Sequence, residues 1–173
     1  ASTLIEVTPV TNPTNDSTPD YTFSSSEDGT ITYGGSCSSN TTSATTDNNT
    51  ISLNSLSDDT YSDCTITVTD NASNSVTLNI SSFTIDSVSP TVSSISPTDN
   101  QGGVPISDNI TVTFSEAMDT TSVTTNTSNT TCSGSFELSS DNFSSCVQMS
   151  SSPTSSNSNM TFTTKPSVSL SYT

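Results

Sequence analysis

Lys165 is the only basic side chain in this sequence of 173 residues, which has no arginine and no histidine but seventeen aspartates and glutamates. Most catalysis near neutral pH uses an imidazole, a tunable amine or a guanidinium group. Serine and threonine nucleophiles are abundant, but only Lys165 could activate them. It precedes Pro166 in a Thr/Ser-rich stretch, which favours a solvated side chain. We therefore predict that the chain is not an enzyme.

Two less favoured chemistries use the carboxylates. Lys165 could form an isopeptide bond to an asparagine with Glu116 or Glu137 as the catalyst, which would suit a surface protein. The pairs Asp58-Asp59 and Glu27-Asp28 could be read as the acid and base of a glycosidase. Adjacent turn side chains diverge, however, so we interpret both pairs as solvated turns.

Calcium is the better metal candidate, because it needs only oxygen ligands in flexible loops. Asp70 and Asp86 are expected near the domain joint, and Asp99 and Asp108 bracket a loop with two glycines. No loop matches the calcium-binding loop of helix-loop-helix proteins, so ordinary turn capping by Asp stays open as the alternative. We expect no other cofactor.

The four cysteines fall into two local pairs, Cys37 with Cys64 and Cys132 with Cys146. Neither pair has CxxC spacing, and no histidine could complete a mixed zinc site, so we predict two disulfides. Closing loops of this length contributes on the order of 3 kcal/mol each in the chain-entropy model. Disulfides persist outside the reducing cytosol, so we predict an extracellular or cell-surface location.

The net charge of −16 at pH 7 restricts the partners. It repels phosphate backbones and anionic membrane surfaces, so we predict no nucleic-acid partner. No stretch approaches the roughly 18 apolar residues of a membrane span, so we also predict no membrane insertion.

Serine and threonine fill about two-fifths of the chain, but the composition does not indicate disorder. Segments such as 65–69 and 109–114 alternate apolar and polar residues with period two and are rich in β-branched residues, which predicts strands with one buried face. We therefore predict an all-β chain. The expected strands are Leu4–Thr8, Pro19–Ser24, Gly29–Tyr33, Thr50–Leu53, Ser62–Thr69, Ser75–Ile85, Thr91–Ser96, Asn109–Phe114, Gly134–Leu138, Val147–Ser150, Met160–Thr163 and Ser167–Tyr172, with a helical turn at Glu116–Val123.

A short Ser/Pro joint near residues 83–90 marks a domain boundary. It divides the chain into residues 1–88, which contain Cys37 and Cys64, and residues 89–173, which contain Cys132 and Cys146. Each half has the length of one small antiparallel β-sandwich.

The segment 94–119, SISPTDNQGGVPISDNITVTFSEAMD, resembles the opening of bacterial Ig-like domains found in surface-layer proteins and large surface adhesins. The first half resembles a related bacterial Ig-like repeat through segments 18–23, 29–35 and 61–74. In such repeats the last of these segments ends in a tight turn, where Ser73 replaces the usual glycine. The resemblance implies two tandem Ig-like β-sandwiches.

Domains that resemble the second half usually continue with further C-terminal strands, so the sheet would be completed by more of the array or by a strand from elsewhere. The resemblance thus implies a structural subunit or stalk segment of a bacterial surface structure: a filament, an adhesin or a surface layer. Such a segment would associate with copies of itself or with neighbouring Ig-like domains, head to tail through strand addition. The alternative is an adhesive or carbohydrate-binding module of a larger secreted protein.

Two groups of residues bear on that alternative. Tyr and Phe at strand positions favour core packing over a sugar-stacking platform. Asn-x-Ser/Thr triplets would be glycosylated only in a host with that machinery. They occur at Asn15, Asn40, Asn48, Asn71, Asn79, Asn109, Asn126, Asn129, Asn142 and Asn159.

Overall fold

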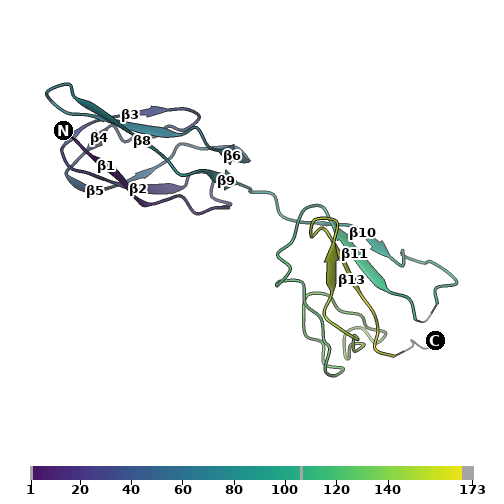
Figure 1. The fold of residues 1–173 in the computed structure, drawn as a ribbon. Helices are drawn as coiled ribbons and strands as arrows, with labels where there is room; N and C mark the ends of the chain where they lie inside the picture. The colour runs from purple at the N-terminus through teal and green to yellow at the C-terminus, as the bar shows by residue number, and fades with distance from the viewer. Residues whose placement is uncertain (1, 106, 169–173) are drawn as a thin grey trace. The chain divides into compact units, whose positions relative to one another are not determined.

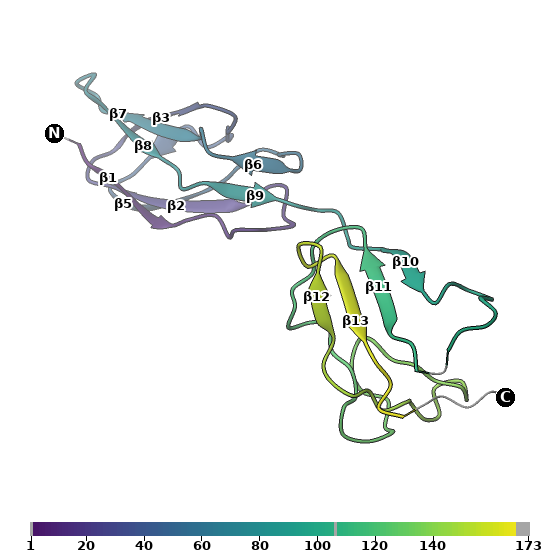
Figure 2. The same ribbon diagram turned by 45° about the vertical axis from the view of Figure 1, so that its right-hand side comes forward.

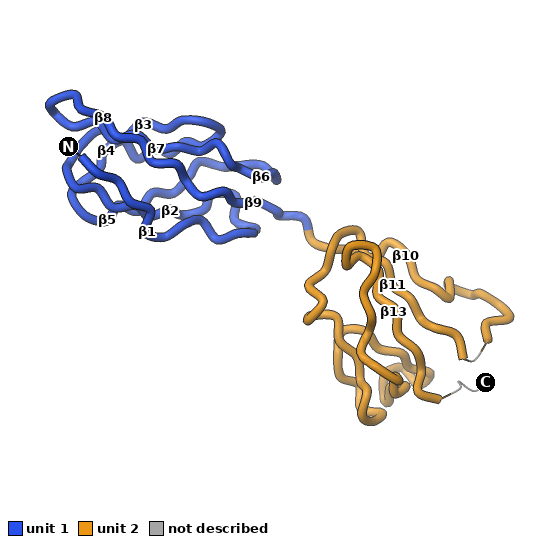
Figure 3. Tube along the Cα trace, in the orientation of Figure 1, with its two compact units in different colours: residues 1–88 blue, residues 89–173 orange. Residues whose placement is uncertain are grey.

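The computed structural model describes residues 2–105 and 107–168. The chain divides into two compact units, residues 1–88 (unit 1) and 89–173 (unit 2), shown in Figure 3. In the described residues there is no helix, and all strand ladders are antiparallel. The all-β prediction is therefore confirmed.

Unit 1 packs two antiparallel sheets face to face, with a small two-stranded sheet beside them (Figure 1). The first sheet has the order β1-β2-β5, the second β4-β3-β7-β8, and the third pairs β6 with β9. The strands are β1 (Leu4–Thr8), β2 (Asp20–Ser25), β3 (Gly29–Gly34), β4 (Ser43–Ala44), β5 (Asp47–Ser52), β6 (Asp59–Tyr61), β7 (Thr65–Thr69), β8 (Ser75–Asn79) and β9 (Phe83–Ile85).

The period-two pattern forms one shared core in unit 1. Tyr21 and Phe23 of β2 meet Ile66 and Val68 of β7 in a single cluster of buried side chains. Complete burial of such a side chain contributes about 1.5–3 kcal/mol. A modest number of inward positions on each strand is therefore enough to hold the sandwich together.

The outward positions of the same strands carry hydroxyl groups that pair across neighbouring strands. The Oγ1 atoms of Thr67 and Thr77 lie 2.8 Å apart, and those of Thr22 and Thr50 also lie 2.8 Å apart. Such cross-strand pairs stabilise a sheet by roughly 0.2–1 kcal/mol each. Threonine thus supplies both β propensity and outer-face hydrogen bonds.

The Cys37–Cys64 disulfide joins the loop after β3 to the residue before β7, with the Cα atoms 5.2 Å apart. Both cysteines are buried in the core cluster. Nearby, Gly35 has φ +72°, and a Cβ there would meet the backbone of Asp63. Close approach of the two segments therefore requires glycine at this position.

The structure corrects one strand of unit 1 and adds two. The predicted strand Ser75–Ile85 is wrong as a single element, because the chain leaves the β7–β8 ladder and re-forms as β9 beside β6. The Ile80 amide donates to the Cys64 carbonyl at this crossing. The short strands β4 and β6 were not predicted, since two or three residues show no periodicity.

Unit 2 contains one four-stranded antiparallel sheet among its described residues, with the order β10-β11-β13-β12 (Figure 2). Residues 115–153 follow an irregular path between β11 and β12. The strands are β10 (Val92–Ser96), β11 (Ile110–Phe114), β12 (Thr154–Ser156) and β13 (Thr161–Thr164).

Three predicted elements of unit 2 are wrong. Gly134–Leu138 and Val147–Ser150 are not strands, apart from an isolated bridge between Met149 and Pro166. Glu116–Val123 forms turns instead of a helical turn. The Asp119 carboxylate there accepts hydrogen bonds from the amide and hydroxyl of Thr121, a local alternative to helical pairing.

The other two differences in unit 2 concern strands near its end. The predicted strand Ser167–Tyr172 lies mostly outside the described residues. The strand β12 was not predicted, because its three residues are all Ser or Thr and show no alternation.

The turn between β7 and β8 keeps its shape without the usual glycine. Ser73 has φ +67°, and the Asp70 carboxylate accepts hydrogen bonds from the amides of Ala72 and Asn74. A left-handed conformation costs a residue with a Cβ roughly 1–2 kcal/mol. The turn therefore holds Ser73 in an unfavourable conformation.

Ser73→Gly should raise the free energy of unfolding of unit 1 by about 1 kcal/mol, because glycine adopts positive φ without steric cost. Urea unfolding measures the change. Ala72→Gly in the same turn is the matched control and should lower the stability, since Ala72 does not have positive φ. A Ser73→Gly variant less stable than the parent would contradict this reading of the turn.

Candidate functional site: an apolar groove and a disulfide-closed loop in unit 2

Unit 2 carries a groove of about 710 Å³ on the inner face of its sheet. Alternation along β11 turns Val112 and Phe114 to this face. A register shift in β10 between Val92 and Ser94 brings Ile95 opposite Val112 and Val92 opposite Phe114. The second wall comes from the irregular segment, through Val123, Phe136 and Leu138 among others. The groove is thus the partly open core of unit 2.

The groove leaves apolar surface in contact with solvent. Val92 is 56% exposed and Ile95 46% exposed, and Ile110, Val112 and Phe114 of β11 are only half-buried. By contrast, the inward side chains of β13 are buried. The open part of the core therefore lies along β10 and β11.

The polar groups of the groove are few. Asp108 and Glu137 are its only charged lining residues in the described part of the chain. Two carboxylates in an otherwise apolar lining favour an uncharged surface over an anionic one. Its volume falls within the range of ligand pockets, about 300–1,000 Å³.

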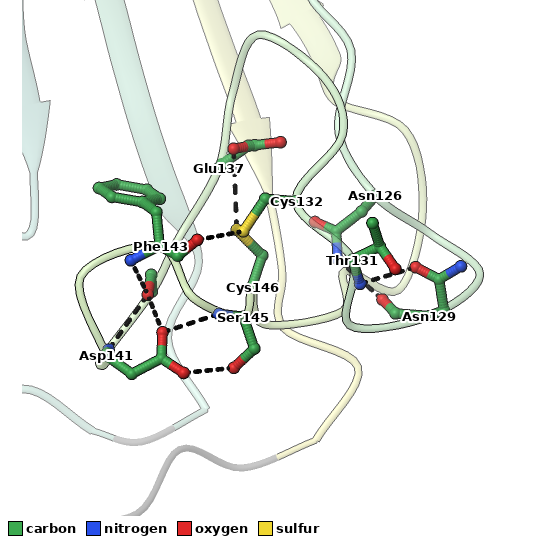
Figure 4. The surroundings of a disulfide bond; sticks show 10 residues. Asn126, Asn129, Thr131, Cys132, Glu137, Asp141, Phe143, Ser145 and Cys146 are labelled. Atoms are coloured by element: carbon green, nitrogen blue, oxygen red, sulfur yellow. Dashed lines mark hydrogen bonds between the residues drawn. A yellow bond between two sulfur atoms is a disulfide. The ribbon is translucent and has the colours of Figure 1, made fainter.

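The Cys132–Cys146 disulfide closes a loop within the irregular segment, with the Cα atoms 4.9 Å apart (Figure 4). A Glu137 carboxylate oxygen lies 3.7 Å from the Cys146 sulfur, and the Phe143 carbonyl oxygen lies 3.5 Å from the Cys132 sulfur. Disulfide sulfurs carry no proton to donate, so both distances are close contacts. This bridge and Cys37–Cys64 confirm the predicted disulfides.

The Asp141 carboxylate organises the loop closed by this disulfide. It accepts hydrogen bonds from the Ser145 hydroxyl at 2.6 Å, the Ser145 amide at 2.9 Å and the Ser139 hydroxyl at 2.8 Å. The Ser145 and Ser139 donors lower the pKa of Asp141 to about 2. Neutral donors thus hold an exposed carboxylate in its charged form.

Phe143 projects from the same loop into solvent. It is 60% exposed, and its ring points away from the disulfide in Figure 4. Asn142 and Phe143 both have positive φ, at 58° and 61°. Two successive left-handed residues in a disulfide-closed loop present the ring outward.

Within the described ranges, none of the four calcium candidates belongs to a group of three or more acidic or cysteine side chains close enough to hold a metal ion. Asp70 is engaged in the β7–β8 turn, where Asn74 and Ala72 donors lower its pKa. Asp86 accepts a hydrogen bond from the Val88 amide at 3.3 Å, while Asp99 lies in the glycine loop and Asp108 lines the groove. Calcium binding stays a prediction.

Only one group of three potential ligands comes together in the described residues: Cys132, Glu137 and Cys146. Its two sulfurs are joined in the disulfide. Since metals bind the thiolate, this group is not a metal site while the bridge is formed.

The sequon asparagines differ in exposure. Asn126 is 3% exposed, and its Nδ2 donates to the Asn129 carbonyl, so the folded chain offers no access for a sugar there. The other nine are exposed at the surface: Asn15, Asn40, Asn48, Asn71, Asn79, Asn109, Asn129, Asn142 and Asn159. Glycosylation of these stays a prediction.

Two functional features were missed by sequence reasoning. The aromatic residues at predicted strand positions, such as Phe114 and Phe162, were identified as core, and Phe162 is buried while Phe114 is half-buried in the groove. Nothing in the periodicity indicated that one stretch of that core would be open. Phe143, between Asn142 and Ser144 in a cysteine-closed loop, was a detectable signal for an exposed ring.

Comparison with protein families matches residues 86–173, just over half of the chain, to the bacterial Ig-like domain family. The chain belongs to this family, and the predicted resemblance to bacterial Ig-like domains is confirmed. Neither a curated protein sequence nor a solved structure matches the chain.

Two observations bear on the predictions about catalysis and membrane insertion. The bacterial Ig-like domain is a non-catalytic fold, and the Lys165 side chain is exposed in unit 2. In the described residues, no helix has the length and apolar character required to cross a bilayer.

The Ser145 amide signal in NMR should titrate with a midpoint near pH 2, because it donates to the Asp141 carboxylate. The folded pKa lies below the unfolded value of about 3.9. The bond therefore contributes full stability above about pH 4 and loses it as the pH falls through 2.

Asp141→Asn should abolish this titration and reduce the loss of unit 2 stability between about pH 4 and pH 2. Asp99→Asn removes one charge from the same unit and is the control, for which the Ser145 titration should persist. A midpoint near pH 4 for the Ser145 amide signal in the parent protein would show that the loop donors do not lower the pKa of Asp141.

Proposed function

We propose that this chain is a structural segment of a bacterial extracellular surface structure, either a stalk or a filament subunit. Its role is to separate or link other parts at the cell surface, so its mechanism is mechanical. The observation that carries the proposal is that each unit contains its own disulfide, Cys37–Cys64 in unit 1 and Cys132–Cys146 in unit 2. Such bridges are kept in oxidising compartments and make small cores durable.

The outer faces of the sheets support the same role. They carry paired threonine hydroxyls in both units, for example Thr67 with Thr77 and Thr111 with Thr163. These hydroxyls bond to each other, which leaves few groups directed toward a specific ligand. Sheet faces covered by paired hydroxyls suit a spacer more than a recognition surface.

Self-association is part of the proposal, and charge limits its form. Copies with a net charge of −16 and a single lysine cannot associate mainly through salt bridges. They would use backbone pairing at sheet edges and apolar contacts. β10 lies at the edge of its sheet and contains no charged residue or proline, the usual protections of an edge strand.

A second candidate, an adhesive or carbohydrate-binding module, is favoured by Phe143. Its ring is exposed on a disulfide-closed loop, a suitable position for stacking on a ligand. Within the described residues Phe143 stacks on no other ring, and a single ring provides a small binding platform. We therefore place this function second.

Immunogold electron microscopy of the producing cells tests the proposed function, with antibodies raised against the folded chain. Label should follow a structure outside the cell envelope. Label confined to the cytoplasm would contradict the proposal, whatever the association state of the purified protein.

Trypsin should leave the chain uncut even after reduction and heat denaturation. The enzyme's specificity pocket requires Lys or Arg, and cleavage is blocked when proline follows, as it does at Lys165-Pro166. Pro166→Ala is the matched control and should yield two fragments, residues 1–165 and 166–173. Tryptic cleavage of the parent chain would contradict this basis for durability outside the cell.

A further inference from the structure

The Cys132–Cys146 disulfide has a third potential metal ligand beside it, the Glu137 carboxylate. The two sulfurs and one carboxylate oxygen lie within 4.8 Å of one another, and Figure 4 shows Glu137 beside the bridge. The bridge blocks metal binding while it is formed, but cysteines are thiols until they are oxidised. The reduced chain therefore carries two thiols and one carboxylate in the same loop.

Backbone hydrogen bonds hold these three ligands together independently of the bond between the sulfurs. The Cys146 amide donates to the Thr130 carbonyl at 2.8 Å, which fixes Cys146 near the segment that carries Cys132. The amide of the next residue donates to the Leu138 carbonyl, also at 2.8 Å, which fixes Cys146 beside Glu137. Reduction of the bridge breaks neither bond, so the ligands are arranged in advance by the backbone.

The distances between sulfur and oxygen atoms suit a tetrahedral metal site. Bonds of about 2.3 Å to sulfur and about 2.1 Å to oxygen place the two ligand atoms about 3.6 Å apart. The Glu137 carboxylate oxygen lies 3.7 Å from the Cys146 sulfur. The Phe143 carbonyl oxygen lies 3.5 Å from the Cys132 sulfur, a distance that a fourth ligand would have. Only the two sulfurs would have to move apart, to about 3.8 Å.

Zinc is the cation that fits this set of donors. It binds both thiolate sulfur and carboxylate oxygen, whereas calcium takes oxygen ligands. Glu137 would occupy the position that a histidine fills in a mixed zinc site. Two thiolates and one carboxylate carry three negative charges, which the single lysine of the chain is too few to neutralise. A divalent cation would neutralise two of them.

We propose that Cys132, Glu137 and Cys146 of the reduced chain bind one zinc ion, which closes the loop before the disulfide does. In an oxidised chain, a dithiol supplies the two electrons and two protons that break the bridge and itself becomes a cyclic disulfide. Zinc then binds the two thiolates, and their protons pass to solvent. Oxidation of the thiols releases the ion. This inference goes beyond the proposed structural role and does not depend on it.

The unit 1 cysteines lack this arrangement. Cys37 and Cys64 are 4% and 2% exposed and belong to the core cluster. An Asp63 oxygen lies 3.9 Å from the Cys64 sulfur, but within the described ranges neither cysteine belongs to a group of three ligands. Cys132, by contrast, is partly exposed, which gives an ion access. We therefore expect one zinc ion per chain.

Cobalt(II) titration of the reduced full chain tests the site, because cobalt binds at zinc sites and its bonds to thiolates absorb light. Dithiothreitol reduces the protein and is removed by anaerobic gel filtration before cobalt is added. One cobalt ion should bind per chain, with a thiolate-to-metal absorption that the oxidised protein lacks, and zinc should displace it. A reduced parent chain without this absorption, whether folded or unfolded, would overturn the inference.

Substitutions separate the proposed site from binding by thiols alone. Cys132→Ala with Cys146→Ala keeps both unit 1 cysteines and should abolish binding. Glu137→Gln keeps all four thiols and should raise the dissociation constant about tenfold or more, since loss of a residue that only supports a ligand already has such an effect. Asp99→Asn removes one charge elsewhere in unit 2 and should leave the affinity unchanged.

Equal cobalt affinities of Glu137→Gln and the parent would overturn the assignment of the carboxylate as a ligand. Binding that survives the loss of Cys132 and Cys146 would overturn the site itself. A loss of affinity in Asp99→Asn as large as that in Glu137→Gln would indicate attraction by net charge alone and would also overturn it.

Discussion

A single lysine cannot neutralise seventeen carboxylates, so hydroxyl and amide groups hold the acidic side chains of this protein. Asp141 bound by Ser139 and Ser145 is the fullest example, and its lowered pKa follows from those donors. Such bonds to a charged group are stronger than neutral ones. The same arrangement recurs in the pairs Glu6–Ser81, Asp20–Ser52, Asp28–Thr46, Asp58–Ser87 and Asp63–Ser36.

This constraint explains the abundance of serine and threonine. In strands, threonine pairs with threonine across the outer faces, and in turns, serine and threonine bind carboxylates. Neither role needs a basic residue, and both leave the surface neutral or acidic. Apolar residues are then needed only at alternate strand positions, which accounts for a folded chain with 27% hydrophobic residues.

The hydrophobic cores of the two units are closed to different degrees. In unit 1 two sheets share a buried core with the Cys37–Cys64 disulfide inside it. In unit 2 one sheet is covered by an irregular segment, and the sheet keeps an apolar groove along β10 and β11. The Cys132–Cys146 disulfide cross-links the irregular segment, which contains no strand among its described residues. The groove lies in unit 2, in the open part of its core.

Much of the fold could be predicted from alternation and cysteine spacing, because both act locally. The strand β1 has its predicted bounds, and both disulfides pair neighbouring cysteines. The strands predicted at Gly134–Leu138 and Val147–Ser150 failed because short apolar runs also pack as irregular cover. The groove could not be predicted, because it depends on how much of the inner face of the unit 2 sheet is covered by the irregular segment.

The central claim is that hydrogen bonds from neutral donors to the carboxylates, in place of ion pairs, stabilise this acidic chain. The most direct test is the free energy of unfolding in urea as NaCl rises from about 0.01 to about 1 M, which shortens the screening length from about 30 Å to about 3 Å. Screening should then reduce repulsion among the carboxylates without weakening the bonds that hold them, so the account predicts that stability rises or stays constant. A clear fall in stability with salt would contradict it, because that is the signature of a fold held by attractive charge pairs.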